Sequence, residues 1–116
     1  MRLVFDAPED QGKLTELARE IVENIPKYCL IPGSSFECIT YNQTTGVFKF
    51  RDIEKDTEWV VTRDGIVENI PAYINDVFSW AGFHVGYICI LDAGNWDAKM
   101  VDELLQFTIF GEVIYW

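Results

Sequence analysis

Four residues of the chain could supply soft metal ligands or a nucleophile with its base: Cys29, Cys38, Cys89 and His84. Structural zinc sites usually bring their ligands in pairs two to four residues apart, and the sequence contains no such pair. No local signature links His84 to a cysteine, and on a strand His84 and Cys89 would point to opposite faces. We therefore expect no metal, no cofactor and no catalytic residue, and interpret these side chains as buried thiols and a core histidine.

A second set of candidate residues is acidic. Asp92, Asp97, Asp102 and Glu103 gather around a predicted loop and helix start, where carboxylates can hold a hard cation or act as acid and base. Their spacing matches no calcium-binding loop, and acids at helix N-termini usually cap the helix or interact with its dipole. The segment Pro32–Ser35 lacks the adjacent Lys-Ser or Lys-Thr pair of a phosphate loop, so we interpret it as a turn.

The chain carries 19 acidic and 9 basic residues among 116, which gives a net charge of −10. The imbalance grows along the chain, since residues 64–116 contain eight acids and a single base, Lys99. Such a protein repels nucleic acids and anionic membranes, because binding to phosphates depends on Lys and Arg. It attracts basic proteins, including those whose natural ligand is a nucleic acid. The charge therefore favours a basic protein partner and disfavours direct nucleic-acid binding.

Aromatic residues make up 15% of the chain, more than one small core readily buries. Trp96 lies among acidic residues and Trp116 ends the sequence, so we expect both rings to be partly exposed. Exposed aromatic rings bordered by carboxylates are typical of protein-binding hot spots. The predicted partner-binding residues are Asp92, Trp96, Asp97, Asp102, Glu103, Glu112 and Trp116.

The first half of the chain predicts a helix followed by an antiparallel meander. The helix should begin near Pro8, because Asp6 can cap it and Pro8 suits its first turn. Apolar residues repeat with helical spacing from Leu14 to Ile25, and the helix should end near Pro26. A loop follows, and then three β-prone runs predict antiparallel strands spanning Phe36–Tyr41, Val47–Ile53 and Glu58–Thr62.

The second half predicts two further helices and more strands. Arg63–Gly65 indicates a turn, Pro71 suits the first turn of a helix that ends near Ala81, and Asp97–Phe107 has helical periodicity. Additional strands are predicted at Arg2–Phe5, Phe83–Leu91 and Thr108–Trp116. We expect one compact α+β domain spanning residues 1–116, with a mostly antiparallel sheet (the three-stranded meander plus additional strands) packed with two or three helices.

One short segment nearly repeats. Ile21–Tyr28 and Ile66–Tyr73 agree at seven of eight positions, and the two copies lie 45 residues apart. The residues around the two copies do not agree, which excludes a solenoid of repeats. We expect the first copy to end a helix and the second to precede one.

The apolar stretches fall far short of a membrane span, and acids follow Met1–Phe5 too soon for a signal peptide. We therefore expect a cytoplasmic protein. In size and charge the chain resembles small phage-encoded inhibitors, such as anti-CRISPR and anti-restriction proteins, and toxin-immunity proteins.

The leading hypothesis is a non-catalytic, acidic inhibitor that binds a basic nucleic-acid-processing protein, such as a nuclease, and blocks its nucleic-acid site. One alternative is a small enzyme or ligand-binding domain with a pocket near Asp92–Asp97 and His84. Another is a homo-oligomer joined through edge strands or through the segment Tyr115–Trp116.

Overall fold

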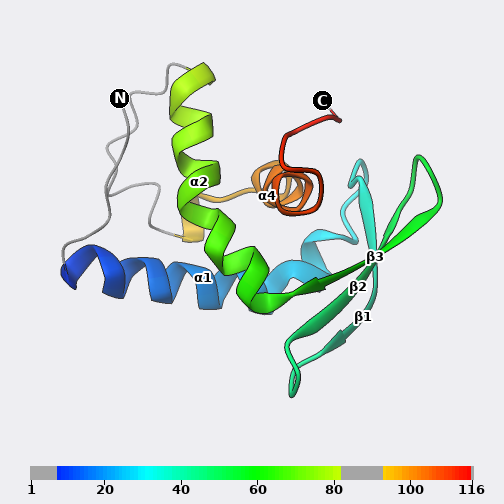
Figure 1. Ribbon diagram of the computed structural model, residues 1–116, viewed down its shortest axis with the longest axis horizontal. Coiled ribbons are helices and arrows are strands. Elements are labelled where there is room, and N and C mark those ends of the chain that lie inside the picture. The colour runs from blue at the N-terminus through cyan, green and yellow to red at the C-terminus, as the bar shows by residue number, and fades with distance from the viewer. Residues whose placement is uncertain (1–7, 82–92, 116) are drawn as a thin grey trace.

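A computed structural model describes residues 8–81 and 93–115, and these form an α+β arrangement, which confirms the predicted fold class. Figure 1 shows the helices gathered on one side of a small sheet. The elements, in chain order, are α1 (Pro8–Tyr28), β1 (Phe36–Asn42), β2 (Val47–Asp52), β3 (Thr57–Thr62), α2 (Arg63–Ala81), the short 3-10 helix η1 (Ala93–Asn95) and α4 (Ala98–Phe110).

The predicted meander is confirmed, with strand order β1-β2-β3 and both pairings antiparallel. Alternation along β2 buries Phe48 and Phe50 against the helices and leaves Lys49 on the outer face of the sheet. The turn into β2 forms because the Asn42 side-chain oxygen accepts hydrogen bonds from two turn N–H groups, and Gly46 adopts a φ of 71°. The strands begin and end within one residue of their predicted limits.

Helix α1 buries the predicted apolar stripe, including Leu17, Ile21 and Ile25, against the sheet and the other helices. The helix ends at Tyr28, two residues beyond the Pro26 near which its end was predicted. Proline removes a single hydrogen-bond donor, and the N–H of Cys29 still donates to the Ile25 carbonyl at 3.0 Å. One proline in the last turn therefore does not end this helix.

Helix α2 begins eight residues before its predicted start at Pro71, so the turn predicted at Arg63–Gly65 is wrong. The Thr62 hydroxyl caps the helix by accepting a hydrogen bond from the Gly65 N–H at 3.1 Å. Burial of Ile66 and Ile70 then holds the first two turns against the core. Packing outweighs the turn-like composition of these residues.

The two near-identical segments, Ile21–Tyr28 and Ile66–Tyr73, both lie inside helices, which corrects the expectation that one ends a helix and the other precedes one. The matched isoleucines of α1 and α2 are all buried in the same core. The common spacing of these isoleucines therefore serves the same packing purpose in both helices.

Helix α4 begins at its predicted place, with Asp97 as the N-cap accepting a hydrogen bond from the Met100 N–H at 2.8 Å. It runs to Phe110 and ends at Gly111, whose φ is 79°. Residues 111–115 form no strand, so the strand predicted at Thr108–Trp116 is wrong. The Thr108 hydroxyl donates to the Leu104 carbonyl, which lets this β-branched residue continue the helix. The strands predicted at residues 2–5 and 83–91 lie outside the described residues.

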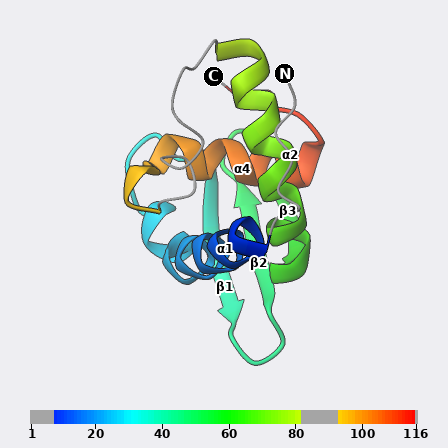
Figure 2. The same ribbon diagram turned by 90° about the vertical axis from the view of Figure 1, so that its left-hand side faces the viewer.

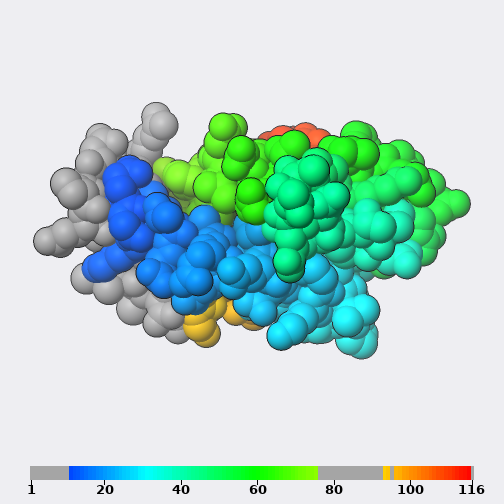
Figure 3. All heavy atoms as spheres, turned by 90° about the horizontal axis from the view of Figure 1, so that it is seen from below, coloured from blue at the N-terminus to red at the C-terminus, as the bar shows by residue number. Residues whose placement is uncertain are grey.

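The three helices and the sheet share one apolar core. In Figure 2, α4 crosses above α1, with the sheet behind both. Figure 3 views the face occupied by α1, with the strands beyond its C-terminal end. No helix among the described residues has the length and apolar character needed to cross a membrane.

Candidate functional site

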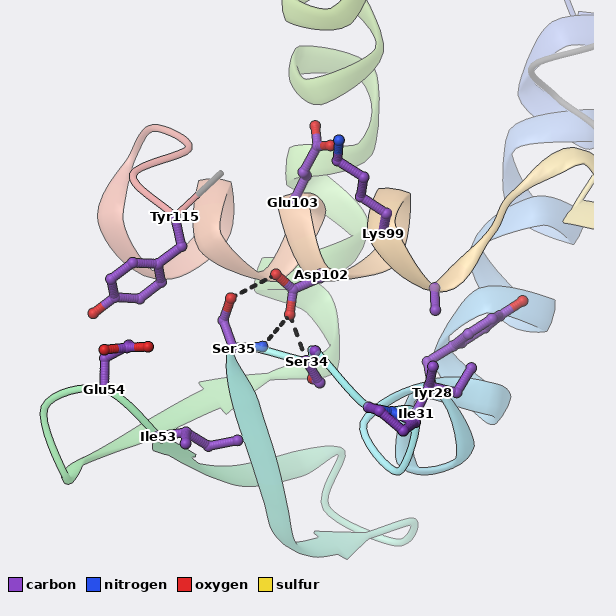
Figure 4. A pocket seen from close by; sticks show the side chains of 13 residues that line it. Tyr28, Ile31, Ser34, Ser35, Ile53, Glu54, Lys99, Asp102, Glu103 and Tyr115 are labelled. Carbon is purple, nitrogen blue, oxygen red and sulfur yellow. Dashed lines mark hydrogen bonds between the residues drawn. The ribbon is translucent and has the colours of Figure 1, made fainter.

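A pocket of about 390 Å³ opens where α4 meets the loop after α1, the β2–β3 turn and the segment that follows α4. Figure 4 shows Asp102 of α4 in the middle of this pocket, with Tyr115 and Glu54 on one side and Tyr28 and Ile31 on the other. The walls combine aromatic and aliphatic side chains with carboxylates, which is the composition of a binding site for a partly apolar ligand.

Asp102 joins α4 to the start of β1 through neutral hydrogen-bond donors. Its Oδ1 accepts from the Ser35 N–H at 2.7 Å, and its Oδ2 accepts from the Ser35 hydroxyl at 2.7 Å. The Gln106 amide, one turn along α4, donates to the same Oδ2 at 2.9 Å. Bonds from neutral donors hold the carboxylate in place and leave its negative charge uncancelled.

The loop that carries Ser35 is shaped by its own backbone. Gly33 adopts a φ of 92°, a conformation that side chains other than glycine rarely take, and the Ser34 N–H donates to the Ile31 carbonyl. The Ile53 N–H donates to the Ser35 carbonyl at 3.0 Å, which joins the loop to the end of β2. The loop and the β2–β3 turn are thereby fixed as two walls of the pocket.

Gln106 fastens the segment after α4 along the third wall. This side chain is fully buried, and its Oε1 accepts from the N–H groups of Ile114 and Tyr115 at 3.0 and 2.7 Å. The Tyr115 hydroxyl donates to Asp52 Oδ2 at 2.8 Å. Burial, with the hydrogen bond to Asp52, raises the pKa of Tyr115 to about 12, so the ring stays neutral as a wall of the pocket.

Two large apolar side chains of the pocket lining, and Leu30 next to one of them in the chain, lie exposed. Leu30 is 84% exposed, Ile31 46% and Ile53 50%. Ile31 and Ile53 line the pocket itself, from the loop and from the β2–β3 turn. Grouped exposed apolar residues mark interaction surfaces more often than scattered ones do.

Two of the pocket carboxylates form no ion pair among the described residues. The ion pairs found there join Arg19 to Glu16, and lysine and arginine on β2 to acids of the neighbouring strands and turn. Neither Glu54 nor Asp102 takes part in one. The single lysine on the pocket wall, Lys99, stands against three acidic residues.

Glu103 occupies a different environment from its neighbour Asp102. It is only 6% exposed, and its Oε2 accepts one long hydrogen bond, at 3.4 Å, from the Tyr73 hydroxyl. Burial raises the pKa of Glu103, and the charge of Lys99 offsets part of this effect. Figure 4 shows Glu103 and Lys99 leaving α4 in another direction from Asp102.

The structure separates the predicted partner-binding residues. Asp97 caps α4 and Glu112 is exposed beyond its end. Asp102 lies in the pocket and Glu103 is buried beside Tyr73, so the four acids do not form one exposed surface. The predicted roles of Asp92 and Trp116 fall outside the described residues.

The predicted exposure of Trp96 is wrong, because this ring is only 5% exposed and packs against Tyr73 with ring centroids 5.5 Å apart. Its acidic neighbour Asp97 caps α4. The pocket suggested near Asp92–Asp97 and His84 cannot be placed, since residues 82–92 lie outside the described part.

Of the pocket lining, only Asp102 and Glu103 were predicted as site residues. The residues missed include Ile31, Ile53 and Glu54 of the lining, and Ser35, Gln106 and Tyr115, which hold its walls together. The sequence marks Ser35 as part of a turn and places Gln106 on the polar side of a helix. Nothing in the local pattern signals that their side chains meet, because Ser35 lies 67 residues from Asp102.

The thiols show no sign of a metal centre within the described residues. No group of three His, Cys, Asp or Glu side chains there could hold an ion. Cys29 and Cys38 are free and partly buried. Burial, together with the nearby Cys38 and Asp102, raises the pKa of Cys29 to about 12, so this thiol is a poor nucleophile.

A second hollow, of about 720 Å³, lies between α1 and α2 and is lined by side chains that include Arg19, Tyr41 and Arg63. Its guanidinium groups distinguish it from the acidic pocket.

In comparisons with known proteins, the chain matches no family model, no curated protein and no solved structure.

Proposed function

We propose that this protein is an acidic, non-catalytic interaction module that binds a basic nucleic-acid-processing protein and blocks its nucleic-acid site. The net charge of −10 supports a basic partner, because opposite charge speeds encounter and selects against acidic surfaces. Among functional classes, small phage-encoded inhibitors and toxin-immunity proteins share this size and charge.

One observation carries the proposal: exposed apolar side chains and carboxylates without ion pairs meet at the same pocket. Protein-binding hot spots combine a central apolar anchor with a polar rim. Here Ile31 and Ile53 supply apolar contact, and Glu54 and Asp102 supply negative charge. This end of the molecule is therefore the proposed docking surface, in place of the surface expected around Trp96.

Inhibition would arise by competition. Carboxylates of this protein occupy positions on the partner where phosphates of the nucleic acid would bind, and the apolar contacts slow dissociation. The charged component weakens as salt screens it, whereas the apolar component does not. The proposal thus requires both a salt-sensitive association rate and a measurable loss of nucleic-acid binding by the partner.

The test begins with capture from nuclease-treated lysate at low and high salt, followed by purification of each stoichiometric basic protein retained. The purified partner is then titrated with this protein in the presence of its nucleic acid. Displacement of the nucleic acid at equimolar inhibitor supports the proposal. A partner that binds this protein and its nucleic acid together would contradict it.

A matched pair of variants locates the surface. Ile53→Ser removes an apolar side chain beside the pocket, and Val60→Ser removes one that is 70% exposed on β3. We expect Ile53→Ser to weaken partner binding by about tenfold or more, and Val60→Ser to leave it unchanged. Equal losses would place the docking surface elsewhere.

A further inference from the structure

We propose that the pocket beside Asp102 receives a single arginine side chain of the protein partner. The inference rests on the proposed function for the source of that arginine. It adds the chemical group that is recognised, and it follows from the shape, the lining and the unpaired charge of the pocket.

The outer part of the pocket suits the aliphatic stem of an arginine. Ile31 and Ile53 lie at the mouth, half exposed, and Tyr28 stands beside Ile31 in Figure 4. A long basic side chain buries its methylene groups against such surfaces while its charged end reaches further in. The volume of about 390 Å³ falls within the range of small-ligand pockets.

The inner part suits the guanidinium group. Asp102 Oδ1 accepts a short hydrogen bond from the Ser35 N–H at 2.7 Å and a long one from the Ser34 hydroxyl at 3.4 Å, and the same hydroxyl also donates to the Phe36 carbonyl at 2.9 Å. The Ser34 hydroxyl has one proton, shared between these two acceptors, so Oδ1 can accept a stronger donor in place of this long bond. A guanidinium N–H would supply it with charge assistance.

The surroundings favour arginine over other ligands. Three acidic residues against one lysine disfavour an anion. The Tyr28 and Tyr115 rings stand on opposite sides of Asp102, and a planar guanidinium packs against an aromatic face more readily than an ammonium does. Glu54, exposed on the β2–β3 turn, lies near Tyr115 and adds a second carboxylate at the mouth.

The experiment uses the full chain labelled with nitrogen-15 and two small probes, N-acetyl-arginine methylamide and its uncharged counterpart N-acetyl-norleucine methylamide. Binding of the arginine probe should shift the amide signals of Ser34, Ser35 and Ile53. The norleucine probe should bind at least about tenfold more weakly, because it lacks the charge-assisted hydrogen bonds. Equal binding of both probes, or shifts centred on the hollow near Arg63, would overturn the proposal.

Three variants separate the pocket from the overall charge. Glu54→Gln removes a pocket carboxylate, and Glu68→Gln removes an exposed carboxylate of α2 that lies outside the pocket lining. Ala98→Phe fills the pocket and leaves every charge in place. We expect Glu54→Gln and Ala98→Phe to weaken binding of the arginine probe by about tenfold or more, and Glu68→Gln to leave that binding unchanged. Equal weakening by the two glutamine variants would overturn the proposal.

The same variants distinguish this inference from the proposed function. If a basic partner binds the Ala98→Phe variant as tightly as the wild type, the arginine pocket is wrong and the interaction function stands. If the arginine probe binds as expected while no partner loses its nucleic acid, the pocket chemistry stands and the proposed function fails. Glu54 lies exposed on a turn, so its variant remains informative even where Ala98→Phe does not fold.

Discussion

The outer face of the sheet and the pocket beside α4 both carry charged side chains, but they hold them in opposite ways. On the sheet, Lys49 pairs with Glu58 at 3.2 Å, and Arg51 pairs with Glu37 and with Asp56. In the pocket, Asp102 is held by a backbone N–H, a hydroxyl and an amide, all of them neutral.

This difference bears on function. Exposed ion pairs cancel each other's charge and contribute little to stability, so the sheet face presents no strong field to a partner. Neutral donors fix a carboxylate without cancelling it, so negative charge remains available at the pocket. Charge that is positioned but not neutralised is expected where a basic ligand binds.

The largest effect should follow removal of the central pocket carboxylate. Asp102→Ala leaves the Ser35 N–H and hydroxyl and the Gln106 amide without their acceptor, and it should lower the free energy of unfolding by about 3 kcal/mol. Urea denaturation measures this loss. A loss below about 1 kcal/mol would show that the network does not hold the loop against α4.

A smaller effect is expected from Gln106→Ala, which releases the segment after α4. The N–H groups of Ile114 and Tyr115 lose their acceptor, and we expect a loss of about 2 kcal/mol. Hydrogen exchange should show both amides losing protection while the Ser35 amide, held by Asp102, keeps it. Continued protection of the two released amides would contradict this role.

Unlike the two preceding variants, Glu103→Gln should not lower the free energy of unfolding at neutral pH. Because burial raises the pKa of Glu103 above its usual 4.5, the folded state holds this proton more tightly than the unfolded state does. Stability from this group is therefore complete below pH 4.5 and is lost as the pH rises through the raised pKa.

The glutamine variant lacks this titration, so at neutral pH it should be as stable as the wild type or more stable, by up to about 1 kcal/mol. Denaturation of both proteins at several pH values above 4.5 checks the prediction. If the stability of the wild type rose over this range relative to the variant, the pKa of Glu103 would be lowered in the folded state and not raised.

The smallest effect is expected on the sheet. Arg51→Met removes two exposed ion pairs at once, yet the free energy of unfolding should change by less than about 1 kcal/mol. The change should shrink further in high salt, as measured by urea denaturation. A loss as large as that of Asp102→Ala would remove the contrast between the two regions.

The fold was predictable where local pattern and packing agree. Alternation at Phe48 and Phe50, with turn residues before Gly46, located the meander, and helical spacing located α1. Where local pattern and packing disagree, the prediction from sequence was wrong. Asp64 and Gly65 have the composition of a turn, but burial of Ile66 draws them into α2.

The candidate site was predictable only in part, since Asp102 and Glu103 were named as site residues and the contacts that distinguish them were not. Residue type and charge do not reveal that one carboxylate meets Ser35 and the other meets Tyr73. Trp96 was misjudged for the same reason, because its exposure depends on where α2 packs.

The sequence by itself determined the net charge, the helical and strand periodicities and hence the α+β class, because these depend on residue type and short spacing. Only the tertiary structure determined which residues come together to form the pocket. It joins Ser35 to Asp102 across 67 residues and Tyr115 to Asp52 across 63. Hydrogen bonds between such distant residues leave no local periodic signal, so they exist only once the chain has packed.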